Sequence, residues 1–271
     1  MSRPRIPRRS RTYDITSSMI AAFGLWSLLC AAPAQADSAS AKRVVKAMSD
    51  YMASQNNLSG EFDVDLDVVT PELEKVQFAA SGSIALERPN KVRVVRKGGY
   101  TEVELLSDGK TVTVKDLGSG HFAQLQSPAT IDQIVDVLRS NYGIDMPGAD
   151  LLLSNSYDEL MAGVIEAKHI GVGVINGVEC EHLAFRNADT DWQLWVRTGD
   201  RPLPCKYVIT SKTVAAAPDF TIQFRNWSSG KAAPATAFKF VPAKGAKRVE
   251  FNQLVGISDL PPPAPITSGG Q

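Results

Sequence analysis

An alternation of acidic and apolar residues early in the chain restricts the fold more than any other feature of the sequence. Residues 61–68 read Glu-Phe-Asp-Val-Asp-Leu-Asp-Val. Successive side chains of a β-strand point to opposite faces, so this segment predicts a strand with one acidic and one apolar face. The alternation returns in residues 76–87 and 91–95. Three antiparallel strands are therefore predicted here, with one face toward water and the other against an apolar layer.

The rest of the chain is also predicted to be mainly β, with a few helices. Asp108-Gly109 and Asn176-Gly177 are typical of tight hairpin turns, in which positive φ is required. We expect roughly ten strands in one large, strongly curved antiparallel sheet, of the α+β class. The further strands are expected near residues 100–106, 111–115, 121–125, 164–174, 180–186, 191–197, 204–210 and 220–224, with a last one beginning at Phe238.

Two segments have apolar residues at helical spacing. Residues 41–54 predict an N-terminal amphipathic helix that lies on the sheet. Residues 131–140 predict a second helix, and shorter helical pieces are expected at 149–153 and 157–161. Because segment 127–162 is the main helical insertion in a β chain, it is the candidate lid over the apolar face.

The first 36 residues have the pattern of a cleavable export signal. Five arginines precede an apolar stretch at residues 19–32, and Ala34-Gln35-Ala36 is an A-x-A cleavage site. The alternative, a membrane-spanning helix, needs roughly 20 apolar residues, more than this stretch provides. We expect a soluble periplasmic protein with a single domain at residues 37–257. Residues 258–271 are rich in Pro and Gly and predict a disordered tail.

The charge balance argues against two classes of partner, and the cysteine count favours a disulfide. Without residues 1–36 the chain has 24 basic and 28 acidic side chains. This balance disfavours nucleic acid or an anionic membrane as a partner. Cys180 and Cys205 remain as an even pair in an oxidising compartment, which favours a disulfide. A metal pair or two free thiols are the alternatives, although no C-x-x-C spacing accompanies the cysteines.

No arrangement of residues in the sequence predicts catalysis. His121, His169 and His182 each lie on a predicted strand, without a second His at ligand spacing. The patterns H-E-x-x-H and G-x-S-x-G are both missing. The acidic side chains of residues 61–67 lack the loop and Gly of a calcium site. They are expected to be solvated or paired with Lys91, Arg93, Arg96 and Lys97. Neither an enzyme activity nor a cofactor is expected.

With catalysis set aside, the remaining possibility is that the interior of the sheet binds a ligand. A curved sheet of this size, closed by few helices, either holds a small ligand in an apolar cavity or is filled by its own side chains. The pattern alone leaves both open. The candidate cavity residues are the inward positions of separate strands: Phe62, Val64, Leu66, Phe78, Ile84, Val92, Val94, Val112, Val114, Trp192 and Ile222.

Three stretches carry a family likeness. They are Leu86-Glu-Arg-Pro-Asn-Lys-Val-Arg-Val94, Ser107-Asp-Gly-Lys110 and residues 191–211. With them the sequence resembles predicted periplasmic proteins of the LolA/LppX-like superfamily of lipoprotein and lipid carriers, over most of residues 41–252. The resemblance implies an unclosed β-barrel with a helical lid and an apolar cavity that accepts acyl chains.

These observations lead to one main hypothesis and two alternatives. The main hypothesis is a periplasmic carrier or sensor whose partner is a lipid or an acylated protein, with a membrane-associated donor or acceptor protein. A protein-interaction module, such as an envelope-stress sensor, would instead have a filled cavity. A secreted hydrolase would depend on His169 or His182.

Overall fold

The computed structural model describes residues 33–254 and residue 257. Nearly all of the predicted export signal, residues 1–36, and the whole predicted tail, residues 258–271, lie outside the described residues. Both therefore stay predictions. No helix among the described residues is long and apolar enough to cross a membrane.

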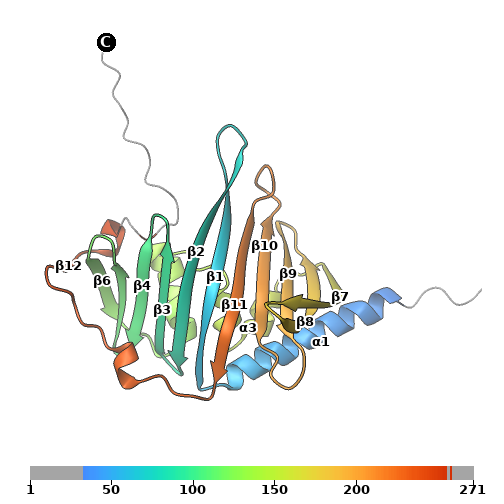
Figure 1. The fold of residues 1–271 in the computed structure, drawn as a ribbon, viewed down its shortest axis with the longest axis horizontal. Helices are drawn as coiled ribbons and strands as arrows, with labels where there is room; N and C mark the ends of the chain where they lie inside the picture. Colours follow the sequence, from blue (N-terminus) through green and yellow to red (C-terminus); the bar gives the residue numbers. More distant parts are fainter. Residues whose placement is uncertain (1–32, 255–256, 258–271) are drawn as a thin grey trace, which may run out of the picture. The chain divides into compact units, whose positions relative to one another are not determined.

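In the described part of the chain, twelve strands form one continuous sheet that does not close on itself (Figure 1). Its order is β12-β6-β5-β4-β3-β2-β1-β11-β10-β9-β8-β7, antiparallel throughout except for the short β12 beside β6. The mainly β, unclosed fold predicted from the sequence is confirmed. The strands are β1 (Asn57–Val69), β2 (Lys75–Glu87), β3 (Lys91–Gly98), β4 (Glu102–Asp108), β5 (Thr111–Asp116), β6 (His121–Gln126), β7 (Glu166–Ile175), β8 (Val178–Arg186), β9 (Thr190–Arg197), β10 (Pro204–Ser211), β11 (Asp219–Ser229) and β12 (Lys247–Arg248).

The N-terminal helix α1 (Pro33–Ser54) fills one half of the interior. Ala41, Val45, Met48 and Met52 are fully buried, at the spacing of one helical stripe. The helix contacts β7, β8 and β9, and on its other side α3 and η1. It begins earlier than the predicted residue 41 but has the predicted apolar face. The half of the sheet from β7 to β9 therefore has a solid core.

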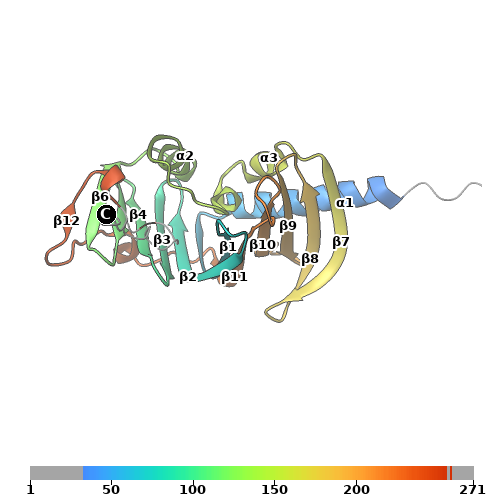
Figure 2. The same cartoon turned by 90° about the horizontal axis from the view of Figure 1, so that it is seen from above.

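The predicted lid segment is helical and lies on one side of the sheet (Figure 2). It consists of α2 (Ile131–Tyr142), the 3-10 helix η1 (Ala149–Leu152) and α3 (Ser156–Met161). Thr130 caps α2 by accepting a hydrogen bond from the Gln133 amide. Gly143 ends the helix with a φ of 62°, a conformation that favours glycine. Both ends of α2 agree with the sequence prediction to within two residues.

The chain after β11 does not form the predicted strand at Phe238. Residues 235–238 are instead the 3-10 helix η2 (Ala235–Phe238), and Phe240 packs on Phe122 with ring centroids 4.9 Å apart. The chain then pairs β12 with β6 and forms η3 (Phe251–Gln253). The alternation of Phe238 and Phe240 suggested a strand. In the structure, both rings instead belong to an irregular segment that crosses the end of the sheet.

The acidic face of β1 is paired with neighbours other than those expected from the sequence. Because β1 lies between β2 and β11, its partners come from these two strands. Lys75 Nζ lies 2.9 Å from Asp67, and Arg225 Nη1 lies 2.8 Å from Glu61. The expected partners on β3 are one strand farther away. Arg93 pairs instead with Glu104 on β4, at 2.7 Å.

Cys180 and Cys205 form the predicted disulfide. It joins β8 to β10 across the end of β9, whose last residue, Arg197, is paired with Cys180. Cys180 is fully buried and Cys205 is 6% exposed. The bond therefore ties together the half of the sheet that packs on α1.

Candidate functional site

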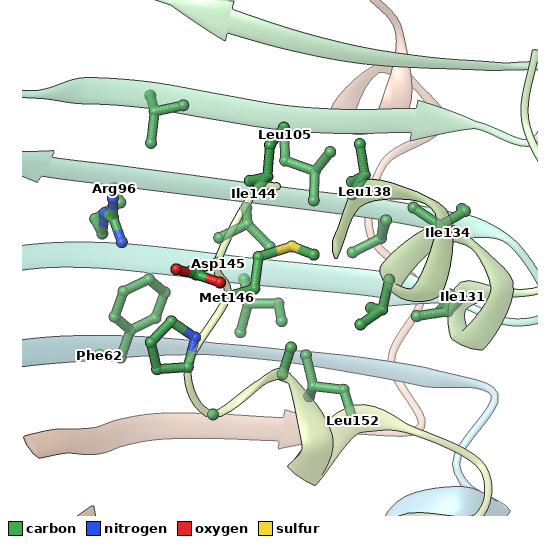
Figure 3. Close-up of a pocket in the computed structure, with 18 of the residues that line it drawn as sticks. Phe62, Arg96, Leu105, Ile131, Ile134, Leu138, Ile144, Asp145, Met146 and Leu152 are labelled. Atoms are coloured by element: carbon green, nitrogen blue, oxygen red, sulfur yellow. The ribbon is translucent and has the colours of Figure 1, made fainter. Parts of the chain in front are cut away.

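An apolar cavity lies between the sheet and the lid (Figure 3). Its floor is formed by β1, β2, β3, β4, β5 and β11, and its roof by α2 with the connection from Ile144 to η1. The space not filled by atoms is about 1130 Å³, counting the part open to solvent. The interior thus combines a solid half under α1 with a hollow half under α2.

Strand alternation explains how the floor is built. Val92 and Val94 are two residues apart on β3 and so point to the same side of the sheet. Antiparallel pairing places Ile84 of β2 opposite Val94, and Leu105 of β4 on its other side. The four side chains form a continuous apolar row across three strands.

The structure places the eleven predicted cavity residues in two groups. Six of them line the cavity: Phe62, Ile84, Val92, Val94, Val114 and Ile222. The other five do not belong to its lining. Val64 and Val112 are buried in the core around it, at 4% and 0% exposure. Leu66 and Phe78 are partly exposed and lie farther along β1 and β2, where Phe78 contacts the ring of Tyr100.

Trp192 belongs to the solid half of the interior. Its ring stacks on Phe185 at 3.9 Å between centroids, and its Nε1 donates to Asn187. Alternation correctly gives the buried face of a strand. It does not show which part of that face is covered by α1 and which part is left hollow, because that depends on contacts between distant segments.

Several cavity residues were not among the predicted ones. Val103 and Leu105 of β4 extend the apolar floor, and the roof residues come from the connection after α2. Arg96 also lines the cavity, although the sequence analysis placed it among the outward cations. Its position two residues after Val94 was the available signal, since it puts Arg96 on the cavity face of β3.

Hydrogen bonds hold the connection after α2 against α2 itself and against the sheet. Arg139 of α2 donates from Nη1 to Asp150, at 2.7 Å, and from Nη2 to the Met146 carbonyl, at 2.9 Å. Arg88 donates from Nη2 to the Leu152 carbonyl at 2.8 Å. Burial lowers the pKa of Arg88, and the nearby Asp132 opposes this effect. The roof is thus fixed by charged groups at its edge and is apolar beneath.

One end of the cavity is polar. Arg96 and Asp145 are the charged side chains among the described residues that line it. Figure 3 shows both of them toward the end of the cavity where Phe62 also lies. Arg96 Nη2 donates to the carbonyl oxygen of Ile257, at 3.2 Å, and Ile257 is itself part of the lining. The cavity therefore combines apolar walls with a hydrogen-bond donor at one end.

The described histidines lie outside this cavity. His169 is bonded through Nδ1 to Ser40 of α1, at 3.2 Å, and through Nε2 to Glu181 of β8, at 2.7 Å. His182 stacks on Trp195 and bonds to Gln193. His169 thus connects α1 to the edge of the sheet. Within the described part of the chain, no group of three or more His, Cys, Asp or Glu side chains is arranged to hold a metal ion.

Comparisons with solved structures show distant similarities across most of the chain. An uncharacterised conserved protein from Thermus thermophilus has a TM-score of 0.47 and 10% identity, over 78% of this chain and 99% of that one. LprF from Mycobacterium bovis has a TM-score of 0.43 and 14% identity, over 73% and 97%. The lipoprotein LppX from Mycobacterium tuberculosis has a TM-score of 0.36 and 12% identity, over 70% and 95%.

Among curated proteins, no significant match is found. A family model matches residues 41–252, which is most of the chain and the same range as the resemblance found in the sequence. The match confirms the likeness to a family of predicted periplasmic proteins and the expected periplasmic location. The chain belongs to DUF2092, the family described as predicted periplasmic protein.

Proposed function

We propose that this protein is a periplasmic binding or carrier protein that holds the acyl chain of a lipid or acylated protein in the cavity beneath α2. The observation that carries the proposal is the cavity itself. It is lined almost entirely by aliphatic and aromatic side chains, and the protein's own side chains do not fill it, whereas the other half of the interior is occupied by the buried face of α1. An empty apolar space destabilises a fold, so a ligand that fills it gives a reason for its presence.

Acyl chains match the chemistry of this cavity. Moving one methylene from water to an apolar site contributes about 0.8 kcal/mol, so a long chain needs few polar contacts to bind. Most floor residues are aliphatic or aromatic, and Arg96 and Asp145 are charged groups of the lining that a polar head group could contact. We further propose that the protein acts without catalysis, receiving its cargo from one membrane-associated partner and passing it to another.

A second candidate function rests on the edge strand β7. Ile170, Val172 and Val174 are 54%, 59% and 68% exposed, and β7 is the last strand of the sheet. An exposed apolar edge can pair with an extended segment of another protein, which adds to the sheet as a further strand. In this case the protein would be an interaction module that recognises an extended apolar peptide.

Isolation of the protein from the periplasm of the bacterium that produces it distinguishes the acyl-chain carrier from the interaction module. We expect native mass spectrometry to show a bound mass that organic extraction identifies as a lipid. The variant Val94→Asp should lose this mass, because it places a charge in the apolar floor. Val95→Asp on the opposite face of β3 is the matched control and should retain it. Recovery of a protein partner with no lipid, together with no uptake of a fluorescent fatty acid, would support the edge-strand function instead.

A further inference from the structure

The apolar face of the cavity floor continues past the cavity, along the hairpin formed by β1 and β2. The two strands pair without a shift in register, so alternate residues of both strands stay on the cavity side. The pairs on this side are, from the cavity outward, Phe62 with Gly82, Val64 with Ala80, Leu66 with Phe78, and Val68 with Val76. The last three pairs form a continuous apolar row, the apolar track, which reaches the end of the hairpin.

The apolar track becomes more exposed with distance from the cavity. Val64 and Ala80 are buried, at 4% and 7% exposure. Leu66 and Phe78 are partly exposed, and Val76 is 41% exposed. The alternation that builds the floor of the cavity therefore also produces an apolar surface that meets water outside it.

The turn at the end of the hairpin exposes a leucine at a position that favours glycine. Leu73 has a φ of 66° and is 66% exposed. Its amide donates to the Thr70 carbonyl at 2.9 Å, and the Thr70 amide donates to the Glu74 carbonyl at 2.9 Å. In a hairpin turn closed in this way, the residue with positive φ is usually glycine, because a side chain there is strained. The chain thus keeps both a strained backbone and an exposed apolar side chain, which indicates a contact with a partner.

An aromatic side chain lies beside the track, nearer the base of the hairpin. Tyr100, in the turn between β3 and β4, is 58% exposed and packs against Phe78 with ring centroids 5.8 Å apart. Figure 1 shows the hairpin of β1 and β2 extending well beyond this turn. Tyrosine is enriched where a bilayer meets water, whereas aliphatic side chains are favoured deeper in the hydrocarbon. The order of Leu73 at the end and Tyr100 nearer the base matches this polarity gradient.

The charges at the end of the hairpin restrict the kind of bilayer. Glu72 and Glu74 are exposed on either side of Leu73. The neighbouring Lys75 is paired with Asp67, at 2.9 Å. Anionic head groups attract clusters of Lys and Arg, and this turn has two acidic side chains and no basic cluster. Zwitterionic head groups, which carry no net charge, fit the turn better.

We propose that the hairpin of β1 and β2 docks directly on a bilayer of zwitterionic lipids, with Leu73 and Val76 in contact with hydrocarbon. An acyl chain then moves between the bilayer and the cavity along the apolar track, and stays against apolar side chains on the way. This inference rests on the proposed function and adds a lipid surface to its partners.

Flotation with phosphatidylcholine vesicles tests the docking, on the protein purified from the periplasm. We expect wild type to float with the vesicles, and Val76→Asp to bind them about tenfold more weakly, as expected when one valine side chain is kept out of hydrocarbon. Val241→Asp, at a 67% exposed valine after η2, is the matched control and should float like wild type. Diphenylhexatriene, a fluorescent hydrocarbon, should move from the vesicles to Val76→Asp about tenfold more slowly than to wild type, while its uptake without vesicles stays unchanged.

The variant Leu73→Gly separates docking from folding. Glycine relieves the strain of the positive φ, so the midpoint of chemical denaturation should stay equal or rise. Binding to the vesicles should still fall about tenfold, because the variant lacks the exposed apolar side chain. A lower midpoint with unchanged vesicle binding would mean that Leu73 serves the fold, and would overturn the proposal.

The outcomes distinguish this inference from the proposed function. If wild type takes up diphenylhexatriene but does not float with the vesicles, or if Val76→Asp and Leu73→Gly float like wild type, the cavity function stands and the docking proposal is overturned. A wild type that stays off the vesicles and forms a dimer that Val76→Asp dissociates would overturn it in favour of a contact between two copies. If wild type takes up no diphenylhexatriene, the proposed function fails and the inference fails with it.

Discussion

The ring of Phe62 on β1 lies directly across Gly82, its partner on β2. A Cβ added to Gly82 would lie 2.3 Å from Phe62 Cζ and 2.3 Å from the Val95 carbonyl oxygen. No real Cβ comes this close to another heavy atom, so only glycine allows the ring to cross the neighbouring strand here. Phe62 reaches the polar end of the cavity by this path.

Gly82→Ala should therefore destabilise the protein and displace Phe62. We expect a loss of about 1–3 kcal/mol in the free energy of unfolding, the range for a methyl group forced into a packed site. Chemical denaturation measures the loss. Gly99→Ala is the control, because a Cβ at Gly99 meets no atom within 4 Å. Equal stability of the two variants would show that Phe62 and β3 move aside at no cost.

Arg139 should control how easily the roof opens. It bonds both Asp150 and the Met146 carbonyl, so Arg139→Gln removes two contacts that hold the two parts of the roof, α2 and the connection after it, together. We expect faster dissociation of a bound hydrocarbon probe, by roughly tenfold if one charged hydrogen bond is lost net. Stopped-flow dissociation gives the rate. Arg186→Gln, at an exposed site on β8, is the control; the same rate in both variants would exclude Arg139 as a clamp.

Protonation of Asp67 should make the protein less stable in acid. Burial opposes its charge, but hydrogen bonds from Lys75, the Asp219 amide and Gln77 outweigh burial and lower the pKa of Asp67. A lowered folded-state pKa gives a contribution that is complete above the unfolded value, near 3.8, and is lost as the pH falls through the folded value. The difference in unfolding free energy between wild type and Asp67→Asn should thus be large at pH ~6 and shrink below pH ~4.

Denaturation at a series of pH values measures this difference. Asp65→Asn, two residues away on the same strand, is the control and should show a smaller change. A constant difference between wild type and Asp67→Asn from pH ~6 to pH ~2 would contradict the assignment, because it would mean that titration of Asp67 does not contribute.

The disulfide should contribute to the stability of the half of the sheet under α1. Cys180 and Cys205 are 25 residues apart, and closing a loop of this length contributes about 3–4 kcal/mol in the chain-entropy model. The double variant Cys180→Ser/Cys205→Ser should lose a similar amount in denaturation. Wild type under reducing conditions should approach the double variant. If reduction leaves wild-type stability unchanged, the bond is not formed or not stabilising.

The elements of the fold and their buried faces could be predicted from the sequence because these depend on local periodicity. The alternation in residues 61–68 gives β1, and the stripe of Ile131, Ile134, Val135 and Leu138 gives α2. Turn and cap residues such as Thr130 mark where elements end, since they act on the backbone within a few residues. The strand predicted at Phe238 is wrong because its alternating rings pack on separate tertiary partners.

The tertiary structure alone decided where the interior is solid and where it is hollow. Trp192 and Val94 have the same alternation on their strands, yet α1 covers the half of the sheet around Trp192, while Val94 faces the cavity. The same holds for Arg96 and Ile257, which are 161 residues apart and meet at the polar end of the cavity. A residue's face is set by its neighbours in the chain, but what lies opposite that face is set by segments far away in sequence.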